Sequence, residues 1–250
     1  MVTSEVRLEI ADGIATLSLD APQRRNALTA SMARAVVEAC EEIDARTDVG
    51  AAIVRGDGPA FCAGAHRDLL ARVGEDPAST AAFDELLSVY RSFTRVGELG
   101  VPTIAAVRGS AVGAGLNLAL ATDVRIVAYD ASLVSGFLPI GAHPGGGHFG
   151  LLERTGGRDT AAAMGLFGER IDGREAVARG LAWVALAEED VDERARALAG
   201  TVADDPALAR HAARSFRTEL GPPALSWEAG LMLEHAPQLW SLRRQREYGR

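Results

Sequence analysis

Apolar and polar side chains alternate with a period of two near the start of the chain. Residues 6–10 and 15–19 each follow this pattern, and Asp12-Gly13 separates the two runs. An aspartate–glycine pair favours a tight turn between antiparallel strands. The pattern therefore predicts a β-hairpin over residues 6–19 with one apolar face and one water-facing face.

The next segment carries apolar residues at helical spacing. Met32, Val36, Cys40 and Ile43 recur every three or four positions, and Thr29 precedes them. A threonine side chain in this place accepts a hydrogen bond from a backbone N–H of the first helical turn. We therefore expect a helix that begins after Thr29 and buries this stripe.

Short apolar runs alternate with helical segments through the middle of the chain. The predicted strands are 51–54, 103–107 and 124–128. The predicted helices between them are 81–96 and about 114–122. Strands that alternate with helices are typical of an α/β core.

From Leu151 onward the pattern is mainly helical. The predicted helices there are 159–167, 173–180, 192–202, 206–220 and 223–240. We therefore divide the chain into an α/β core over residues 1–195 and a helical C-terminal region over residues 196–250.

Composition narrows the class of protein. The chain has 250 residues, a formal net charge of −8 and two cysteines, Cys40 and Cys62. An acidic balance argues against a nucleic-acid partner. The cysteines lack the spacing of zinc ligands, so we expect no metal. With no apolar run of membrane-spanning length and no apolar leader segment, we expect a cytoplasmic protein without a membrane partner.

Two glycine/alanine corners each adjoin an apolar, strand-like run. The first is Phe61–Ala65, which reads FCAGA, and the second lies within Gly109–Asn117, which reads GSAVGAGLN. Two such corners can aim two backbone N–H groups at one oxygen, which is an oxyanion hole built without side chains. The alternative is that the glycines only serve tight strand–helix junctions.

Six segments, taken in order, resemble the crotonase superfamily of enoyl-CoA hydratase/isomerase proteins. They are Arg24–Leu28, Phe61–Ala65, Pro102 with the strand after it, Gly109–Asn117, Ala121–Asp123 and Pro144–Gly147. The resemblance implies a crotonase-like spiral of ββα units with a helical C-terminal region that forms homotrimers or dimers of trimers. It also implies an acyl-CoA thioester as ligand, with coenzyme A as part of the substrate and no separate cofactor.

The resemblance assigns roles to both corners. The N–H groups of Ala65 and Ala114 would hold the thioester carbonyl oxygen, and Ala114 opens a helix whose dipole favours negative charge there. Gly113 and Gly115 would let the ligand approach the backbone closely. Ala63, Gly64 and Gly113 are expected to bind the CoA ligand.

A basic loop precedes the first corner. In the resembling family the loop containing Arg24, Arg25 and Ala27 lies against the nucleotide end of CoA, where a guanidinium can pair with phosphate. The alternative is a solvated surface pair of arginines. We expect Asn26 to shape the turn rather than to touch ligand.

Two positions depart from the family's hydratases, which carry two glutamates that hold and activate water. The corresponding residues here are Asn117 and Phe137. An amide can orient water or substrate but cannot act as a general base, and a phenyl ring can do neither. The departure argues against ordinary syn-hydration and leaves Asn117 as a positioning candidate.

Histidines near the corners are candidates for proton transfer, since imidazole titrates near neutral pH. His143 either supplies the acid/base group or caps a glycine-rich turn. For His148 we favour a buried, hydrogen-bonded role. His66 follows Ala65 directly and is either a base or a turn partner of Asp68.

Three functions remain open at this point. The first is an enoyl-CoA hydratase/isomerase-like enzyme that stabilises an enolate, including a His-assisted decarboxylase or hydrolase. The second is a non-catalytic acyl-CoA-binding protein, and the third is a structural subunit. The glycine/histidine segment 141–148 favours the first, whereas Phe137 favours the second.

Overall fold

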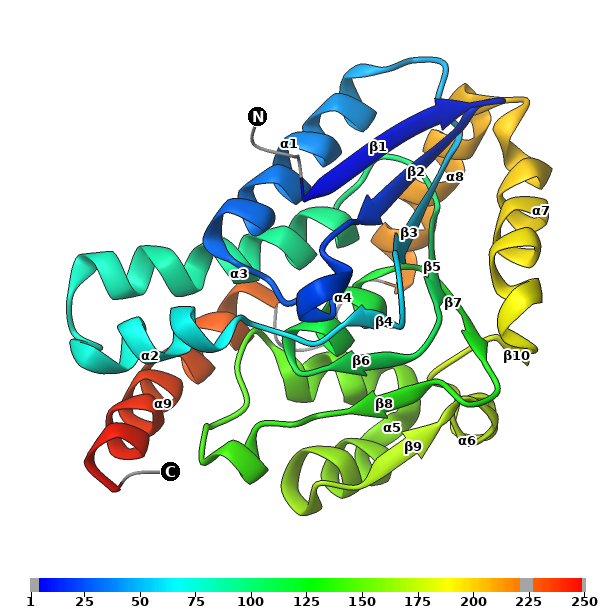
Figure 1. Cartoon of the computed structure of the whole chain (residues 1–250). Helices are drawn as coiled ribbons and strands as arrows, with labels where there is room; N and C mark the ends of the chain where they lie inside the picture. Colours follow the sequence, from blue (N-terminus) through cyan, green and yellow to red (C-terminus); the bar gives the residue numbers. More distant parts are fainter. Residues whose placement is uncertain (1–4, 221–226, 249–250) are drawn as a thin grey trace.

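The computed structural model describes residues 5–220 and 227–248 and contains two β-sheets (Figure 1). One has the strand order β1-β2-β3-β5-β7-β10, and the other has the order β4-β6-β8-β9. The strands are β1 Val6–Ala11, β2 Ile14–Leu19, β3 Ala51–Gly56, β4 Ala60–Cys62, β5 Thr103–Val107, β6 Ser110–Val112, β7 Val124–Ala128, β8 Ser132–Val134, β9 Arg170–Asp172 and β10 Val184–Leu186.

Helices enclose the two sheets (Figure 1). The α-helices are α1 Ala30–Ala45, α2 Arg67–Glu75, α3 Thr80–Gly97, α4 Ala114–Ala121, α5 His148–Phe167, α6 Gly173–Ala178, α7 Val191–Ala203, α8 Pro206–Leu220 and α9 Trp227–Tyr248. Short 3-10 helices are η1 Pro22–Arg24, η2 Leu138–Ile140 and η3 Glu188–Asp190. Helix α7 packs on β3, β5 and β7, and α1 packs on α3.

The chain winds as a spiral that adds one strand to each sheet at every step. Strands β3, β5 and β7 pair in parallel in the larger sheet. Each is followed by a short strand of the smaller sheet, and β4, β6 and β8 again pair in parallel. Because helices return the chain to the next step, these are the repeated ββα units that the sequence predicts, and the fold class is confirmed.

The predicted hairpin forms, but its second strand has no water-facing side. Strands β1 and β2 pair antiparallel, and β2 then pairs in parallel with β3. Thr16 and Ser18 are only 7% and 2% exposed. The prediction of a wet face is wrong for β2 because helices α1 and α7 pack against it.

The first predicted helix is confirmed in detail. The Oγ1 of Thr29 accepts a hydrogen bond from the backbone nitrogen of Met32 at 3.1 Å. The stripe of Met32, Val36, Cys40 and Ile43 is fully buried.

The C-terminal part is less uniformly helical than predicted. Strand β9 pairs antiparallel with β8, and β10 pairs in parallel with β7. Both strands have three residues, too few to show a periodic pattern. Helix α5 begins at His148 instead of Asp159 and contains a break at Gly157, where φ is 78°.

The division at residue 195 falls within α7, whose Ala195 and Ala199 are buried. A separate trimerisation region therefore stays a prediction. The stretch 221–226, at the start of the last predicted helix, lies outside the described residues. Among the residues that are described, no helix is both long and apolar enough to cross a membrane.

Candidate active site

A mainly apolar cavity of about 70 Å³ lies between the two glycine corners and α9. Its wall includes residues 63–65, 112–114 and 135–137. Its other lining residues are Leu70, Leu86, Val89, Tyr90, Ile140, Ala142, Gly145 and Gln238. The cavity is therefore located where the sequence predicts a thioester site.

The second corner joins β6 to α4. Gly113 has a φ of 54°, a conformation that glycine adopts without strain. Its backbone nitrogen donates to the carbonyl of Val134 at 3.0 Å. Ala114 is the first residue of α4, so its N–H has no acceptor within the helix and is available at the positive end of the helix dipole.

The first corner is held in place by the loop that follows η1. The backbone nitrogen of Leu28 donates to Gly64 at 2.7 Å, and that of His66 donates to Leu28 at 2.8 Å. In such a parallel bridge the N–H of the residue between, Ala65, points away from Leu28. This N–H is thus free of the bridge that anchors its neighbours.

The two corners touch each other. A Cβ placed on Gly64 would lie 2.7 Å from the carbonyl oxygen of Val112 and 3.5 Å from the backbone nitrogen of Ala114. Any larger residue at position 64, where φ is 90°, would therefore separate the corners. The structure brings together Ala63, Gly64 and Ala65 with Gly113 and Ala114, as the sequence predicts.

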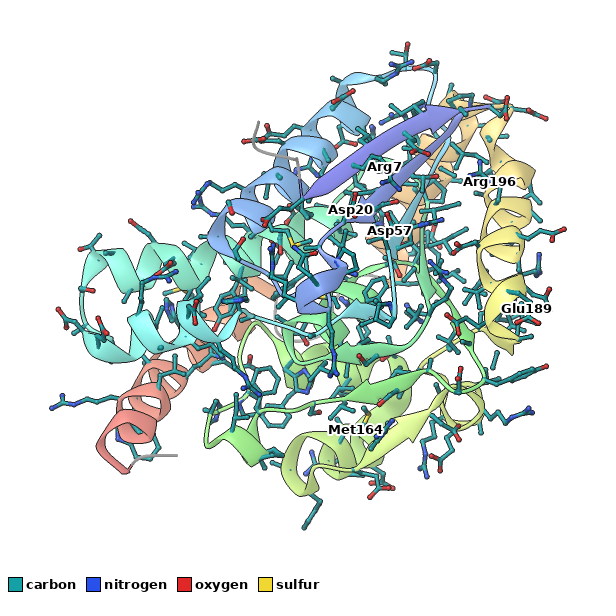
Figure 2. The ribbon with its side chains drawn as sticks, viewed as in Figure 1. Arg7, Asp20, Asp57, Met164, Glu189 and Arg196 are labelled. Atoms are coloured by element: carbon teal, nitrogen blue, oxygen red, sulfur yellow. The ribbon has the colours of Figure 1, made fainter. Side chains whose placement is uncertain are left out.

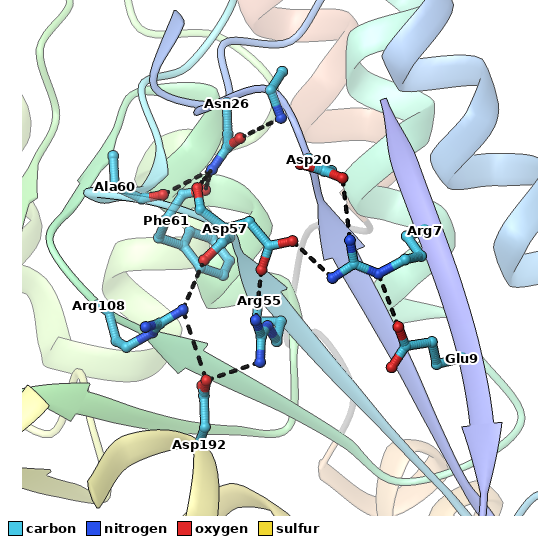
Figure 3. Close-up of polar contacts among 12 residues, drawn as sticks. Arg7, Glu9, Asp20, Asn26, Arg55, Asp57, Ala60, Phe61, Arg108 and Asp192 are labelled. Carbon is cyan, nitrogen blue, oxygen red and sulfur yellow. Dashed lines mark hydrogen bonds and ion pairs between the residues drawn. The ribbon is translucent and has the colours of Figure 1, made fainter. Parts of the chain in front are cut away.

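Asn26 organises the turn that leads into the first corner. Its fully buried side chain accepts from the nitrogen of Ala21 at 2.8 Å and donates to the carbonyls of Asp57 and Ala60 at 2.9 and 2.8 Å (Figure 3). Its φ of 55° is left-handed, which asparagine tolerates better than most residues. The prediction that Asn26 shapes the turn is confirmed.

An ion-pair network supports the same turn from the outside. Arg7 lies 3.1 Å from Asp20 and 2.8 Å from Asp57, and these three side chains cluster beside the hairpin (Figure 2). Arg55 joins Asp57 to Asp192 on α7, with a nitrogen–oxygen distance of 2.9 Å to Asp192 (Figure 3). The network links the first strands of the larger sheet to α7.

The basic loop runs beside the first corner. Arg24 pairs with Glu5 at 2.5 Å, and this hydrogen bond lowers the pKa of the Glu5 carboxyl. Arg24 also donates to the carbonyl of Ala27 at 3.1 Å. The Arg25 side chain is exposed, and the backbone carbonyl of Arg25 accepts a hydrogen bond from the backbone nitrogen of Ala63 at 2.9 Å. Binding of CoA by Arg24, Arg25 and Ala27 stays a prediction.

His66 caps the start of α2. Its Nδ1 accepts from the backbone nitrogen of Asp68 at 3.3 Å and lies 3.8 Å from the Asp68 carboxylate. This geometry matches the predicted turn partnership. His66 is not among the residues that line the cavity, so its role as a base has no geometric support here.

His143 is half-buried in the glycine-rich segment. Its Nδ1 lies 2.6 Å from the carbonyl oxygen of Pro144, and its own carbonyl accepts from Gln238 at 3.4 Å. The residue does not line the cavity either. Its acid/base role stays a prediction.

The Asn117 side chain belongs to a buried series of hydrogen-bonded polar side chains. Its Nδ2 donates to the carbonyl of Gly145 at 3.0 Å, and its Oδ1 lies 2.7 Å from Nδ1 of His148. The Nε2 of His148 lies 2.7 Å from Oγ of Ser135. Because Oδ1 can only accept, Nδ1 of His148 carries the proton and Nε2 accepts from Ser135.

The side chains of Asn117, His148 and Ser135 are all buried, and of these three residues only Ser135 lines the cavity. Burial lowers the pKa of His148 to about 3, so its imidazole is neutral at physiological pH. The prediction of a buried, hydrogen-bonded His148 is confirmed. Ser135 carries no sequence signal, because its partner His148 lies 13 residues away in the sequence, and His148 lies 31 residues from Asn117.

Phe137 closes the apolar side of the cavity. Its ring centroid lies 4.9 Å from that of His148, and a Cβ on Gly113 would lie 3.6 Å from its Cζ. Phe137 therefore presents a hydrocarbon surface to the cavity.

Helices α9 and α3 each contribute one group that sequence reasoning missed, Glu234 and Tyr90. The Glu234 carboxylate accepts hydrogen bonds from the backbone nitrogens of Gly147 and His148 at 2.6 and 3.2 Å. These bonds lower its pKa, but burial has the larger effect and raises the pKa to about 7. The Tyr90 hydroxyl on α3 is buried and has no hydrogen-bond partner within the described part of the chain. Burial, and then the charge of Glu234, raise the pKa of Tyr90 well above 10.

Comparison with known proteins identifies the family to which the chain belongs. The family model for enoyl-CoA hydratase/isomerase matches residues 9–229. The chain belongs to this family. It is thus a member of the crotonase superfamily, as the order of its motifs predicts.

Relatives of this enoyl-CoA hydratase/isomerase family member align over most of its length. A probable enoyl-CoA hydratase of Mycobacterium tuberculosis is 38% identical over 240 residues, with 95% of this chain and 92% of the relative covered. The 1,2-epoxyphenylacetyl-CoA isomerase of Escherichia coli is 32% identical over 201 residues, with 79% and 75% covered. An enoyl-CoA hydratase/isomerase from Xanthobacter autotrophicus is 29% identical with a TM-score of 0.85, covering 98% and 94%.

Proposed function

We propose that the protein binds an acyl-CoA thioester and stabilises an enolate oxygen with the N–H groups of Ala65 and Ala114. The proximity of Gly64 to Val112 and Ala114 carries this proposal, because Ala65 and Ala114 line the same cavity and their N–H groups can share one oxygen there. Each oxyanion-hole donor contributes about 3 kcal/mol to transition-state stabilisation.

The lining of the cavity matches an apolar acyl group. Leu70, Leu86, Val89 and Phe137 face the space beyond the two corners. The Tyr90 hydroxyl is a buried donor at the same wall and suits an acyl group that carries one polar oxygen. The exposed Arg25, beside Ala63, suits the phosphates of CoA.

The polar side of the cavity does not support hydration of a double bond. The Asn117 amide is bonded to Gly145 and His148 and does not line the cavity, and Phe137 offers no polar atom. Decarboxylation of a malonyl-type thioester depends mainly on the stabilised enolate, whereas isomerisation of a double bond also needs a group that moves a proton between two carbons. One relative carries the name of a CoA-ester isomerase. We therefore favour enolate chemistry in which no water is added to a double bond.

A second candidate function is non-catalytic binding of acyl-CoA. The apolar wall at Phe137 favours this function. It is also favoured because neither His66 nor His143 lines the cavity. Both functions need the paired amides, and they differ only in turnover.

One experiment tests the proposal. The purified chain is titrated with saturated, enoyl and malonyl-type CoA esters while products are followed by chromatography. Binding with conversion of any ester supports the enzyme, and binding of all esters without conversion supports the second candidate. Absence of binding to every ester contradicts both.

We also propose assembly as a homotrimer or a dimer of trimers. Several large apolar side chains are exposed on the described surface, among them Phe167 at 85% and Trp183 at 67%. Light scattering coupled to size exclusion tests the assembly, and a monomeric mass would contradict it.

A further inference from the structure

Ser135, His148 and Asn117 form a linear chain of side chains that reaches the cavity at its serine end. We propose that Ser135 is a nucleophile that accepts the acyl group of a bound acyl-CoA, which makes the protein an acyl-CoA thioester hydrolase. This inference rests on the proposed thioester site and its two amides, which in this reaction hold the oxyanion of a tetrahedral intermediate instead of an enolate oxygen.

The hydrogen bonds of the chain have a defined direction. Gly145 fixes the Asn117 amide through Nδ2 at 3.0 Å, which leaves Oδ1 to accept from Nδ1 of His148 at 2.7 Å. The lone pair of Nε2 is then aimed at Oγ of Ser135, also at 2.7 Å. A nucleophile within reach of a base that a third group orients is the arrangement of serine and cysteine hydrolases, including those with asparagine as the third member.

The nucleophile adjoins the paired amides. Gly113 donates its N–H to Val134, and a Cβ on Gly113 would lie 3.4 Å from the carbonyl oxygen of Ser135. Ser135, Ala65 and Ala114 line the same small cavity. Ser135 therefore belongs to the same cavity wall as Ala65 and Ala114, and the proposal requires its Oγ to reach the carbonyl carbon of a thioester held there.

The proposed reaction has two steps. The Oγ of Ser135 attacks the thioester carbonyl carbon while Nε2 of His148 accepts the Oγ proton, and the oxyanion rests on the two amides. The C–S bond then breaks, and the proton passes from His148 to the sulfur, so CoA leaves as a thiol. Water next attacks the acyl ester and gives one proton to His148. That proton returns to Oγ of Ser135 as the C–O bond breaks and the carboxylic acid leaves.

The site predicts slow turnover. Asn117 brings no negative charge to stabilise the imidazolium, and burial lowers the pKa of His148 to about 3. The rings of Phe137 and Phe149 pack on the imidazole, with centroids 4.9 and 6.2 Å away. An acyl chain would fill most of the 70 Å³ cavity and hinder the attacking water. We therefore expect the acyl-enzyme to accumulate.

The test measures the acyl-enzyme and the binding of ligand separately. The full chain is incubated with acetyl-, butyryl-, octanoyl- and phenylacetyl-CoA, and intact mass, peptide mapping and CoA release are followed. Calorimetry of CoA esters reports binding. The variants are Ser135→Ala and, as the matched control, Ser132→Ala, since Ser132 is buried on β8 and does not line the cavity.

The expected result is one acyl group on Ser135 in the native chain and in Ser132→Ala. Ser135→Ala should bind the same ester without acylation, and its CoA release should fall by about 100-fold or more. Binding of esters without acylation of the native chain overturns the nucleophile, as does unchanged CoA release in Ser135→Ala. Absence of binding overturns the thioester site as well, which separates the two failures.

Discussion

The carboxylate of Glu234 lies 2.6 Å from the backbone nitrogen of Gly147, so the last helix of the chain caps the helix that begins at His148. Helix N-termini favour a negative charge, whereas burial opposes one. For Glu234 burial dominates, and its pKa is raised to about 7 from an ordinary value of 4.5. The cap that holds His148 in place is therefore itself sensitive to pH.

This raised pKa predicts a loss of stability as pH rises from about 4.5 to 7. In that window the unfolded carboxyl is ionised while the folded one keeps its proton, so folding costs more at each higher pH. The full contribution amounts to about 3 kcal/mol at most. Urea denaturation at pH 5 and pH 8 should show that Glu234→Gln, relative to the native chain, gains free energy of unfolding at pH 8. An equal difference at both pH values would contradict the raised pKa.

Asn26 is predicted to be the costliest side chain of its loop to remove. Asn26→Ala leaves the nitrogen of Ala21 and the carbonyls of Asp57 and Ala60 without their buried partner. We expect a loss of about 2–4 kcal/mol in the free energy of unfolding. The neighbouring Arg25→Ala, which also replaces a left-handed residue but an exposed one, serves as the control. Comparable losses in the two variants would argue against the buried bonds as the cause.

Ala114→Pro removes the amide of the second corner with little change to the helix. Proline is accepted at the first helical position because that N–H has no helical partner. We expect the affinity for acyl-CoA or the rate of its conversion to fall by about 100-fold. Ala30→Pro makes the same change at the first position of α1 and should leave both quantities unchanged. Retained binding and conversion in Ala114→Pro would remove this amide from the site.

Tyr90→Phe separates ligand binding from stability. The hydroxyl is buried without a partner in the described residues, so its removal should leave the free energy of unfolding unchanged or raise it by about 1 kcal/mol. The same variant should bind a 3-oxoacyl-CoA more weakly while binding of the saturated ester is kept. Calorimetry with the two esters measures the difference, and parallel losses for both would assign Tyr90 to packing alone.

The local pattern of apolar and polar residues is sufficient to predict the elements that bury only one face. The α1 stripe from Met32 to Ile43 and its Thr29 cap follow from side-chain spacing alone. The burial of both faces of β2 does not follow from spacing, because Thr16 and Ser18 are covered by helices that lie elsewhere in the sequence. Strands of three residues, such as β9, are too short to show the alternation of apolar and polar residues that predicts a strand.

The candidate site divides in the same way. Glycine corners are local, so Gly64 and Gly113 were found from sequence, and the structure brings them together. The Ser135–His148–Asn117 chain depends on how β8, α5 and α4 pack, and no spacing along the chain reveals it. Sequence reasoning therefore placed proton transfer at His143, whereas the polar chain that reaches the cavity contains His148.

A crystal structure of the chain with bound butyryl-CoA tests the central claim most directly. The account predicts that the thioester carbonyl oxygen lies within about 3.2 Å of both backbone nitrogens, those of Ala65 and Ala114. A butyryl-CoA whose carbonyl oxygen contacts neither nitrogen, or only one, would contradict it.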